Sequence, residues 1–183
     1  MDFMGKYLEY HSYYEIPRNY AFWSALALLG ATINRKVMFF HGDIEIFAPL
    51  YVLLVGPQGN GKTTSCDFAS NLFQRLSPDL EVGASTQSAE DIVTTMAKDT
   101  FVRCFTNDQG EQVEVRPMAM FISEFKDFIA YNPIRMLNFL TNMYDRKVFK
   151  AGTVKRGAEN IINPSLNILA CENPDQLIGF MKN

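Results

Sequence analysis

The residues best suited to chemistry form one glycine-rich stretch, Gly56-Pro57-Gln58-Gly59-Asn60-Gly61-Lys62-Thr63, which we call the phosphate loop. Its pattern is GxxxxGK followed by Ser or Thr. Glycines let successive backbone N–H groups point at an anion, and a following helix presents its positive dipole end to the same anion. Lys62 adds a positive charge, and the Thr63 hydroxyl is the expected ligand of Mg²⁺. The sequence therefore predicts that ATP and Mg²⁺ are bound here by Gly56, Gln58, Gly59, Asn60, Gly61, Lys62, Thr63 and Thr64.

The neighbouring sequence supports this interpretation over a chance glycine-rich turn with a solvated lysine. The continuous apolar run 50–55 precedes the loop and predicts a strand buried on both faces. A helix is expected from about Lys62 to Leu76, with Phe68, Leu72 and Phe73 facing the sheet. A phosphate loop requires this strand–loop–helix context.

A second group of polar residues follows another apolar run, 118–122. Glu124 is placed to orient or deprotonate an attacking water molecule. Together with Thr63 and Ser123, it is also expected to hold the metal. The competing interpretation makes Glu124 an ordinary acidic residue at the start of a surface helix.

The third apolar run, 166–171, ends at Glu172 and Asn173. Glu172 is a rival to Glu124 for the catalytic acid. Asn173 is a candidate polar sensor of the terminal phosphate, which makes Lys62, Glu124 and Asn173 the predicted catalytic set. An asparagine before Pro174 is also a common way to begin a helix, and both interpretations stay open.

Strands that alternate with helices predict an α/β fold with a mainly parallel sheet. We expect an N-terminal segment, 1–48, with helices near 3–15 and 20–33, the second capped by Asn19, and a hairpin over 37–47. The core would be 49–183, with further helices at 88–98 and 134–144 and from Pro174, and a hairpin over 101–116.

Composition excludes several classes of protein. The 183 residues carry a net charge of only −3, which argues against a general electrostatic attraction to nucleic acid but allows a local basic patch. Cys66, Cys104 and Cys171 are widely spaced, so neither a zinc site nor a disulfide framework is expected, in keeping with a cytoplasmic location. The apolar stretch 20–33 is shorter than the ~18 residues of a membrane span.

The segment 147–157 is a local basic patch, since four of its eleven residues are Lys or Arg. With Gly152 and Gly157 in it, the segment predicts a hairpin that could follow the phosphate backbone of a nucleic acid. The alternative is a solvated loop balanced by Asp145 and Glu159. Arg135 and Arg146 are conceivable phosphate-sensing arginines.

The order of these segments resembles the P-loop ATPase domain of phage, plasmid and integrative-element replication proteins, which is related to AAA+ and superfamily 3 helicases. The resemblance rests on the phosphate loop, Ile122-Ser123-Glu124, Met143-Tyr144-Asp145, the basic segment and Asn163-Pro164-Ser165-Leu166. It implies a three-layer P-loop NTPase sandwich of the AAA+ or RecA-like kind. It also implies a DNA-translocating motor that works as a ring of copies, with a basic hairpin that contacts single-stranded DNA through Lys150, Lys155 and Arg156.

Two departures from these relatives bear on function. Many of them carry an aspartate where this chain has Ser123, and a serine bonds a metal-bound water without adding negative charge. Such domains also usually continue to a further strand and an arginine that reaches the ATP of a neighbouring copy. We therefore expect this chain to be a fragment of a larger protein, and the alternative is that a partner supplies the arginine.

Two other functions are compatible with the sequence. A nucleotide-gated switch would hold ATP with little hydrolysis, whereas a small-molecule kinase would need an arginine-rich lid that is not evident. The adenine-contacting residues are not identified by any motif, although Tyr14, Ile16 and Pro17 lie upstream of the loop.

Overall fold

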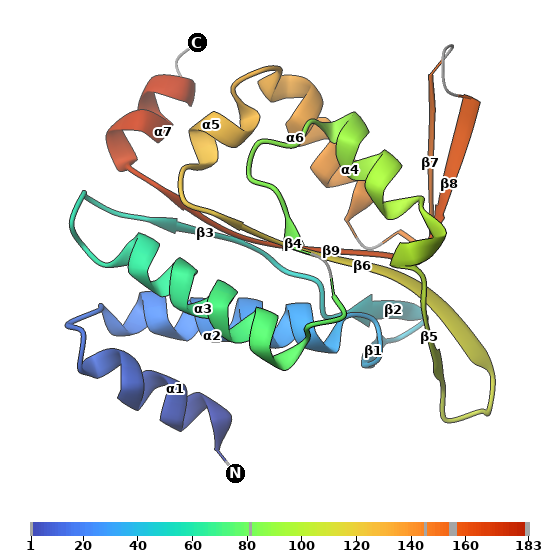
Figure 1. Ribbon diagram of the computed structural model, residues 1–183, viewed down its shortest axis with the longest axis horizontal. Helices are drawn as coiled ribbons and strands as arrows, with labels where there is room; N and C mark the ends of the chain where they lie inside the picture. The colour runs from blue at the N-terminus through green and yellow to red at the C-terminus, as the bar shows by residue number, and fades with distance from the viewer. Residues whose placement is uncertain (1, 81, 145, 154–156, 182–183) are drawn as a thin grey trace.

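The computed structural model describes residues 2–80, 82–144, 146–153 and 157–181. Its centre is a five-stranded, mostly parallel sheet (Figure 1). Strands β3 (Tyr51–Val55), β9 (Pro164–Glu172), β6 (Gln112–Ile122) and β4 (Val82–Gly83) lie in that order and pair in parallel, and β5 (Arg103–Thr106) pairs antiparallel with β6. The predicted α/β class with a mainly parallel sheet is confirmed.

Helices cover both faces of the sheet, which gives three layers (Figure 1). On one face lie α2 (Arg18–Ile33) and α3 (Lys62–Leu76), with α1 (Phe3–Ser12) packed outside them. The other face carries α4 (Ala89–Met96), α5 (Phe125–Ile129), α6 (Pro133–Met143) and α7 (Pro174–Met181), and a short 3₁₀ turn, η1, spans Asp99–Phe101. No described helix is long and apolar enough to cross a membrane.

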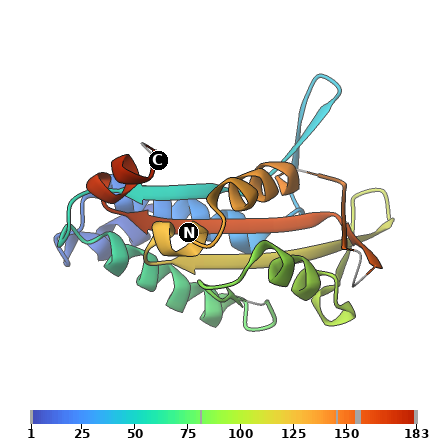
Figure 2. The same cartoon turned by 90° about the horizontal axis from the view of Figure 1, so that it is seen from above.

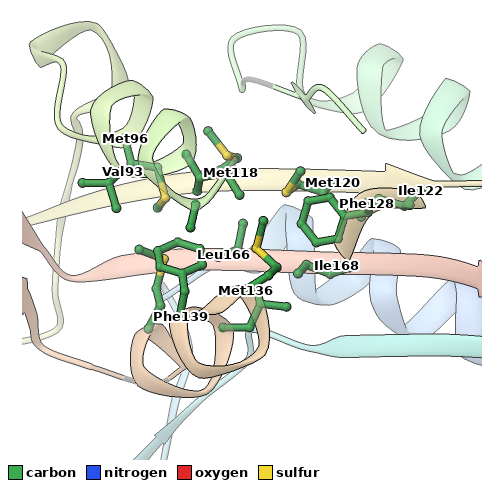
Figure 3. Close-up of a cluster of buried hydrophobic side chains, with 14 of the residues drawn as sticks. Val93, Met96, Met118, Met120, Ile122, Phe128, Met136, Phe139, Leu166 and Ile168 are labelled. Atoms are coloured by element: carbon green, nitrogen blue, oxygen red, sulfur yellow. The ribbon is translucent and has the colours of Figure 1, made fainter. Parts of the chain in front are cut away.

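The largest core cluster lies between the sheet and α4, α5 and α6 (Figure 3). Methionines from three elements, Met96, Met118, Met120 and Met136, meet there, and flexible thioethers fill irregular gaps between helices and strands. Strand β9 is buried along its whole length because it has a partner on each side and helices on both faces. It is therefore a central strand of the sheet.

Local signals placed several elements correctly. Helix α3 has the predicted bounds, Lys62–Leu76. Helix α4 begins with a capping box, in which the Ser88 hydroxyl accepts from the Asp91 N–H and the Asp91 carboxylate accepts from the Ser88 N–H. This reciprocal pair satisfies two N–H groups that the helix itself leaves unpaired.

The start of α2 was predicted wrongly. Pro17, not Asn19, is the N-cap, because proline has the φ value that suits entry into a helix and its missing N–H costs nothing at that point. Asn19 lies inside the first turn, where its side chain accepts from the Tyr20 N–H. Phe22, in the same helix, is exposed.

The sheet also differs from the prediction. Strand β3 lies at one end of the described strand order and is half-buried, not buried on both faces. Strand β6 runs unbroken through Pro117, where two separate strands were expected. A proline is tolerated there because β5 pairs with β6 only up to Val115 and β4 pairs from Ala119, so no partner on that side needs its N–H.

Two hairpins extend from the three layers. One joins β1 (Met38–His41) to β2 (Ile44–Phe47) and projects from the body with Phe39 and Phe40 exposed (Figure 2). The other joins β7 (Val148–Thr153) to β8 (Gly157–Ile162). Both were predicted from the sequence.

Candidate functional site

A cavity of about 550 Å³ opens at the carboxyl ends of β3, β6 and β9. Crevices at the carboxyl ends of parallel strands are where open α/β sheets bind ligands. Residues 14–16, 58–64, 123–124, 172–173 and 176 line it. The structure thus brings nearly all the candidate phosphate, metal and catalytic residues to one place.

The phosphate loop connects β3 to α3 and depends on two left-handed glycines. Gly59 has φ 78° and Gly61 has φ 75°, a region that other residues enter at a cost. Gly61 is also the N-cap of α3 and provides no side-chain cap, so the N–H groups of the first turn are left for another acceptor. The helix end has the form of an anion site.

Gly56 is required for a steric reason. The Tyr20 hydroxyl donates a 3.0 Å hydrogen bond to the Val55 carbonyl and lies directly against Gly56, where a Cβ atom would overlap it. Helix α2 therefore supports the end of β3 from beneath.

Lys62 is almost fully buried, with 8% of its surface exposed. Its ammonium group donates to the carbonyl oxygens of Gly56 at 2.6 Å and Pro57 at 2.7 Å. An ammonium has three N–H donors, so one remains for a ligand. The charge is thereby held directly over the phosphate loop.

Ser123 and Glu124 follow β6, and both side chains are exposed at the cavity. Glu124 occupies the N-cap position of the short helix α5, which is the position that the competing interpretation gave it. Its side chain makes no capping hydrogen bond, so its place at the start of the helix does not engage its carboxylate.

Glu172 differs sharply from Glu124, because only 5% of it is exposed. One carboxylate oxygen accepts from the Lys126 N–H at 2.6 Å, and the other accepts from the Asn173 N–H at 2.7 Å. Asn173 in turn accepts from the Asp175 N–H with its side-chain oxygen, which begins α7. The helix-start interpretation of Asn173 is therefore observed, while its amide nitrogen remains available to the cavity.

The segment between α1 and α2 forms the remaining wall of the cavity. Tyr14, Glu15 and Ile16 line it, and Ile16 packs against Gly61, where an added Cβ atom would lie 3.1 Å from the Ile16 side chain. Pro17 is not among the lining residues. An aromatic and an aliphatic side chain beside the phosphate loop suit the flat face of a nucleotide base.

The donor set fits Mg²⁺. Mg²⁺ is usually held by one or two carboxylates, a hydroxyl and the phosphates of its nucleotide, and not by a protein cage. Thr63, Ser123, Glu124 and Glu172 supply those groups here. Within the described residues there is no group of three or more His, Cys, Asp or Glu side chains that could hold a metal ion by itself.

Two buried cysteines lie under the loop and are structural. Cys66 of α3 donates from Sγ to the Leu169 carbonyl at 3.6 Å, and its interaction with the Cys171 thiol together with burial raises the pKa of Cys66. All three cysteines are free. A thiol that stays protonated is neither a nucleophile nor a metal ligand.

The basic hairpin lies at the other end of the sheet (Figures 1 and 2). It leads into the amino end of β9, so its base is roughly 25–30 Å from the cavity along the nine residues of that strand. Lys150 is exposed and lines a shallow cleft with Arg146 and Phe149. Lys155 and Arg156 lie outside the described residues.

Neither candidate sensing arginine reaches the cavity in this chain. Arg135 forms an ion pair with Glu90, and Arg146 donates from Nε to the Asn142 carbonyl at 3.1 Å. Gln176, which no sequence signal indicated, does reach it and accepts from the Lys126 ammonium at 2.7 Å.

Comparison with protein-family models and with curated proteins gave no match for this sequence.

Proposed function

We propose that this chain is an ATP-binding domain that hydrolyses ATP and drives a DNA-acting, helicase-like motor. One observation carries the proposal: the phosphate loop lines a single cavity together with carboxylates from the ends of two neighbouring strands. A cationic, N–H-rich cradle beside acids suits a triphosphate with a divalent cation.

Each group has a role that follows from its position. The N–H groups of the phosphate loop and the free donor of Lys62 would bind the β- and γ-phosphate oxygens. The Thr63 hydroxyl, with Ser123 and Glu124, would hold Mg²⁺, which neutralises charge on the phosphates when it is bound. Glu124, exposed and free of capping bonds, would orient and deprotonate the attacking water. The Asn173 amide would contact the terminal phosphate or that water.

The DNA-binding part of the proposal rests on β9. The basic hairpin leads directly into this strand, and Glu172 and Asn173 stand at its far end. A strand that is buried throughout and paired on both sides moves as a unit, so a shift at the nucleotide could be transmitted to Lys150. The proposal includes binding of single-stranded DNA by Lys150, Lys155 and Arg156. It also includes assembly into a ring of copies, and both parts are supported by the resemblance described above.

The rival function is a nucleotide-gated switch, and Ser123 is the residue that favours it. Without a second negative charge after β6, the metal would be held weakly and turnover would be slow. Tight ATP binding without hydrolysis, with or without DNA, would select the switch.

The test is ATP hydrolysis by the purified chain with and without single-stranded DNA. Glu124→Gln should abolish turnover while ATP still binds at saturating Mg²⁺, and Lys150→Ala combined with Lys155→Ala and Arg156→Ala should remove only the stimulation by DNA. Lys98→Ala is the matched control, because it removes an exposed positive charge that lies just after α4 and does not line the cavity. Turnover that DNA never changes, in any variant, would contradict the motor.

A further inference from the structure

Glu172 is a buried acid without a positively charged partner among the described residues. The ion pairs there join Arg116 to Glu114, Arg135 to Glu90 and Lys147 to Glu45. Lys62, the buried cation of the cavity, donates to its own loop. Buried carboxylates are normally paired with a cation or coordinate a metal, and Glu172 lacks such a cation among the described residues.

The carboxylate of Glu172 is nevertheless fixed in direction. It accepts one backbone N–H on each oxygen, and a carboxylate has about four acceptor positions, so roughly two remain. Glu172 also lines the cavity beside Thr63 and Glu124. Its remaining acceptor positions are therefore available to a ligand in the cavity.

The position of β9 explains why this residue is central. β9 lies between β3, which carries the phosphate loop, and β6, which carries Ser123 and Glu124. The bond from the Lys126 N–H ties Glu172 to the first turn of α5, directly after Glu124. The charge that Ser123 does not supply is therefore present one strand closer to the phosphate loop.

We propose that Glu172 supplies the second negative charge of the magnesium site, accepting hydrogen bonds from the water molecules around an ATP-bound Mg²⁺. This inference rests on the proposed function. Without a cation, a buried carboxylate facing a triphosphate repels it, whereas with Mg²⁺ in between the same charge attracts. Glu172 therefore makes ATP binding dependent on the metal.

The test measures binding and not turnover. A fluorescent, slowly hydrolysed ATP analogue is titrated into wild type and Glu172→Gln, first in EDTA and then across a Mg²⁺ series. In EDTA the variant should bind as tightly as wild type or more tightly, because a repulsive charge is gone. In Mg²⁺ its half-saturating metal concentration should rise about 10- to 100-fold, the usual effect of removing a group that holds a metal's ligands.

Moving the negative charge to another residue of the cavity provides a more specific test. Ser123→Asp placed in the Glu172→Gln background should restore the wild-type dependence on Mg²⁺, since it returns a carboxylate to the same cavity. Asp127→Asn is the matched control, because it removes an exposed carboxylate from α5 outside the cavity and should change nothing. A loss of affinity that is equal with and without Mg²⁺ would show a purely structural role and overturn the proposal.

A variant at an exposed position covers the case in which Glu172→Gln does not fold. Ser123→Asp alone should change the Mg²⁺ requirement less than about threefold, because the charge is already supplied. A gain of tenfold or more would show that the charge was missing and would overturn the inference. Failure of wild type to bind the analogue at all would instead contradict the proposed function, whereas an unchanged Glu172→Gln would contradict this inference alone.

Discussion

The contact between Tyr20 and Gly56 gives a prediction in which one substitution rescues another. Gly56→Ala would place a methyl group against the Tyr20 hydroxyl, which lies inside van der Waals contact of that position. Tyr20 is only 7% exposed and its hydroxyl is bonded to Val55, so the ring cannot swing away freely. Overpacking of this kind costs about 1–3 kcal/mol.

Tyr20→Phe removes the hydroxyl and one hydrogen bond, with a net cost of about 0.5–1.5 kcal/mol. In that background the nearest ring atom to the new methyl is Cζ, at 3.1 Å, which needs a shift of only a few tenths of an ångström. The free energy of unfolding that the double variant loses should therefore be smaller than the sum of the two single losses by about 1 kcal/mol or more. For a domain of this size, that difference corresponds to about 2–4 °C in Tm.

The assay is urea unfolding of the four proteins followed by circular dichroism. Gly179→Ala is the matched control, since a Cβ atom there meets nothing within 4 Å and its effect should add independently to that of Tyr20→Phe. Additivity of the Gly56 and Tyr20 changes to within about 0.5 kcal/mol would refute the proposed steric coupling.

Three further outcomes are expected. Lys62→Met should weaken binding of the ATP analogue about tenfold or more in the same titration, because a charged hydrogen bond is worth about 1.5–3 kcal/mol; an unchanged affinity would contradict the role of the loop. Burial lowers the pKa of His11, so protonation favours the unfolded chain and the stability present above its ordinary pKa is lost as pH falls. His11→Phe should accordingly lose less stability than wild type when urea unfolding is repeated from pH 7 down to pH 5, and equal losses would exclude His11 as a cause. In thermal melts analysed for free energy, Phe73→Ala should cost about 3–5 kcal/mol, whereas Phe39→Ala on the exposed hairpin should stay within about 0.5 kcal/mol.

The sequence by itself determined the features that a few adjacent residues encode. These features are the phosphate loop, the bounds of α3, the capping box at Ser88 and both hairpins. They depend on glycines, turn residues and capping residues that act on neighbours a few positions away in the sequence. Such signals are readable because the groups that satisfy each other lie close together in sequence.

Long-range packing decided what the sequence could not. Three features depend on which strands pair, and the paired strands are distant in the chain. They are the insertion of β9 between β3 and β6, the half-buried position of β3, and the unbroken course of β6. The same pairing buries Glu172 and leaves Glu124 exposed, although both follow apolar runs of the same kind. An acid's surroundings, and therefore its chemistry, are set by neighbouring strands, and only the tertiary structure distinguishes these two carboxylates.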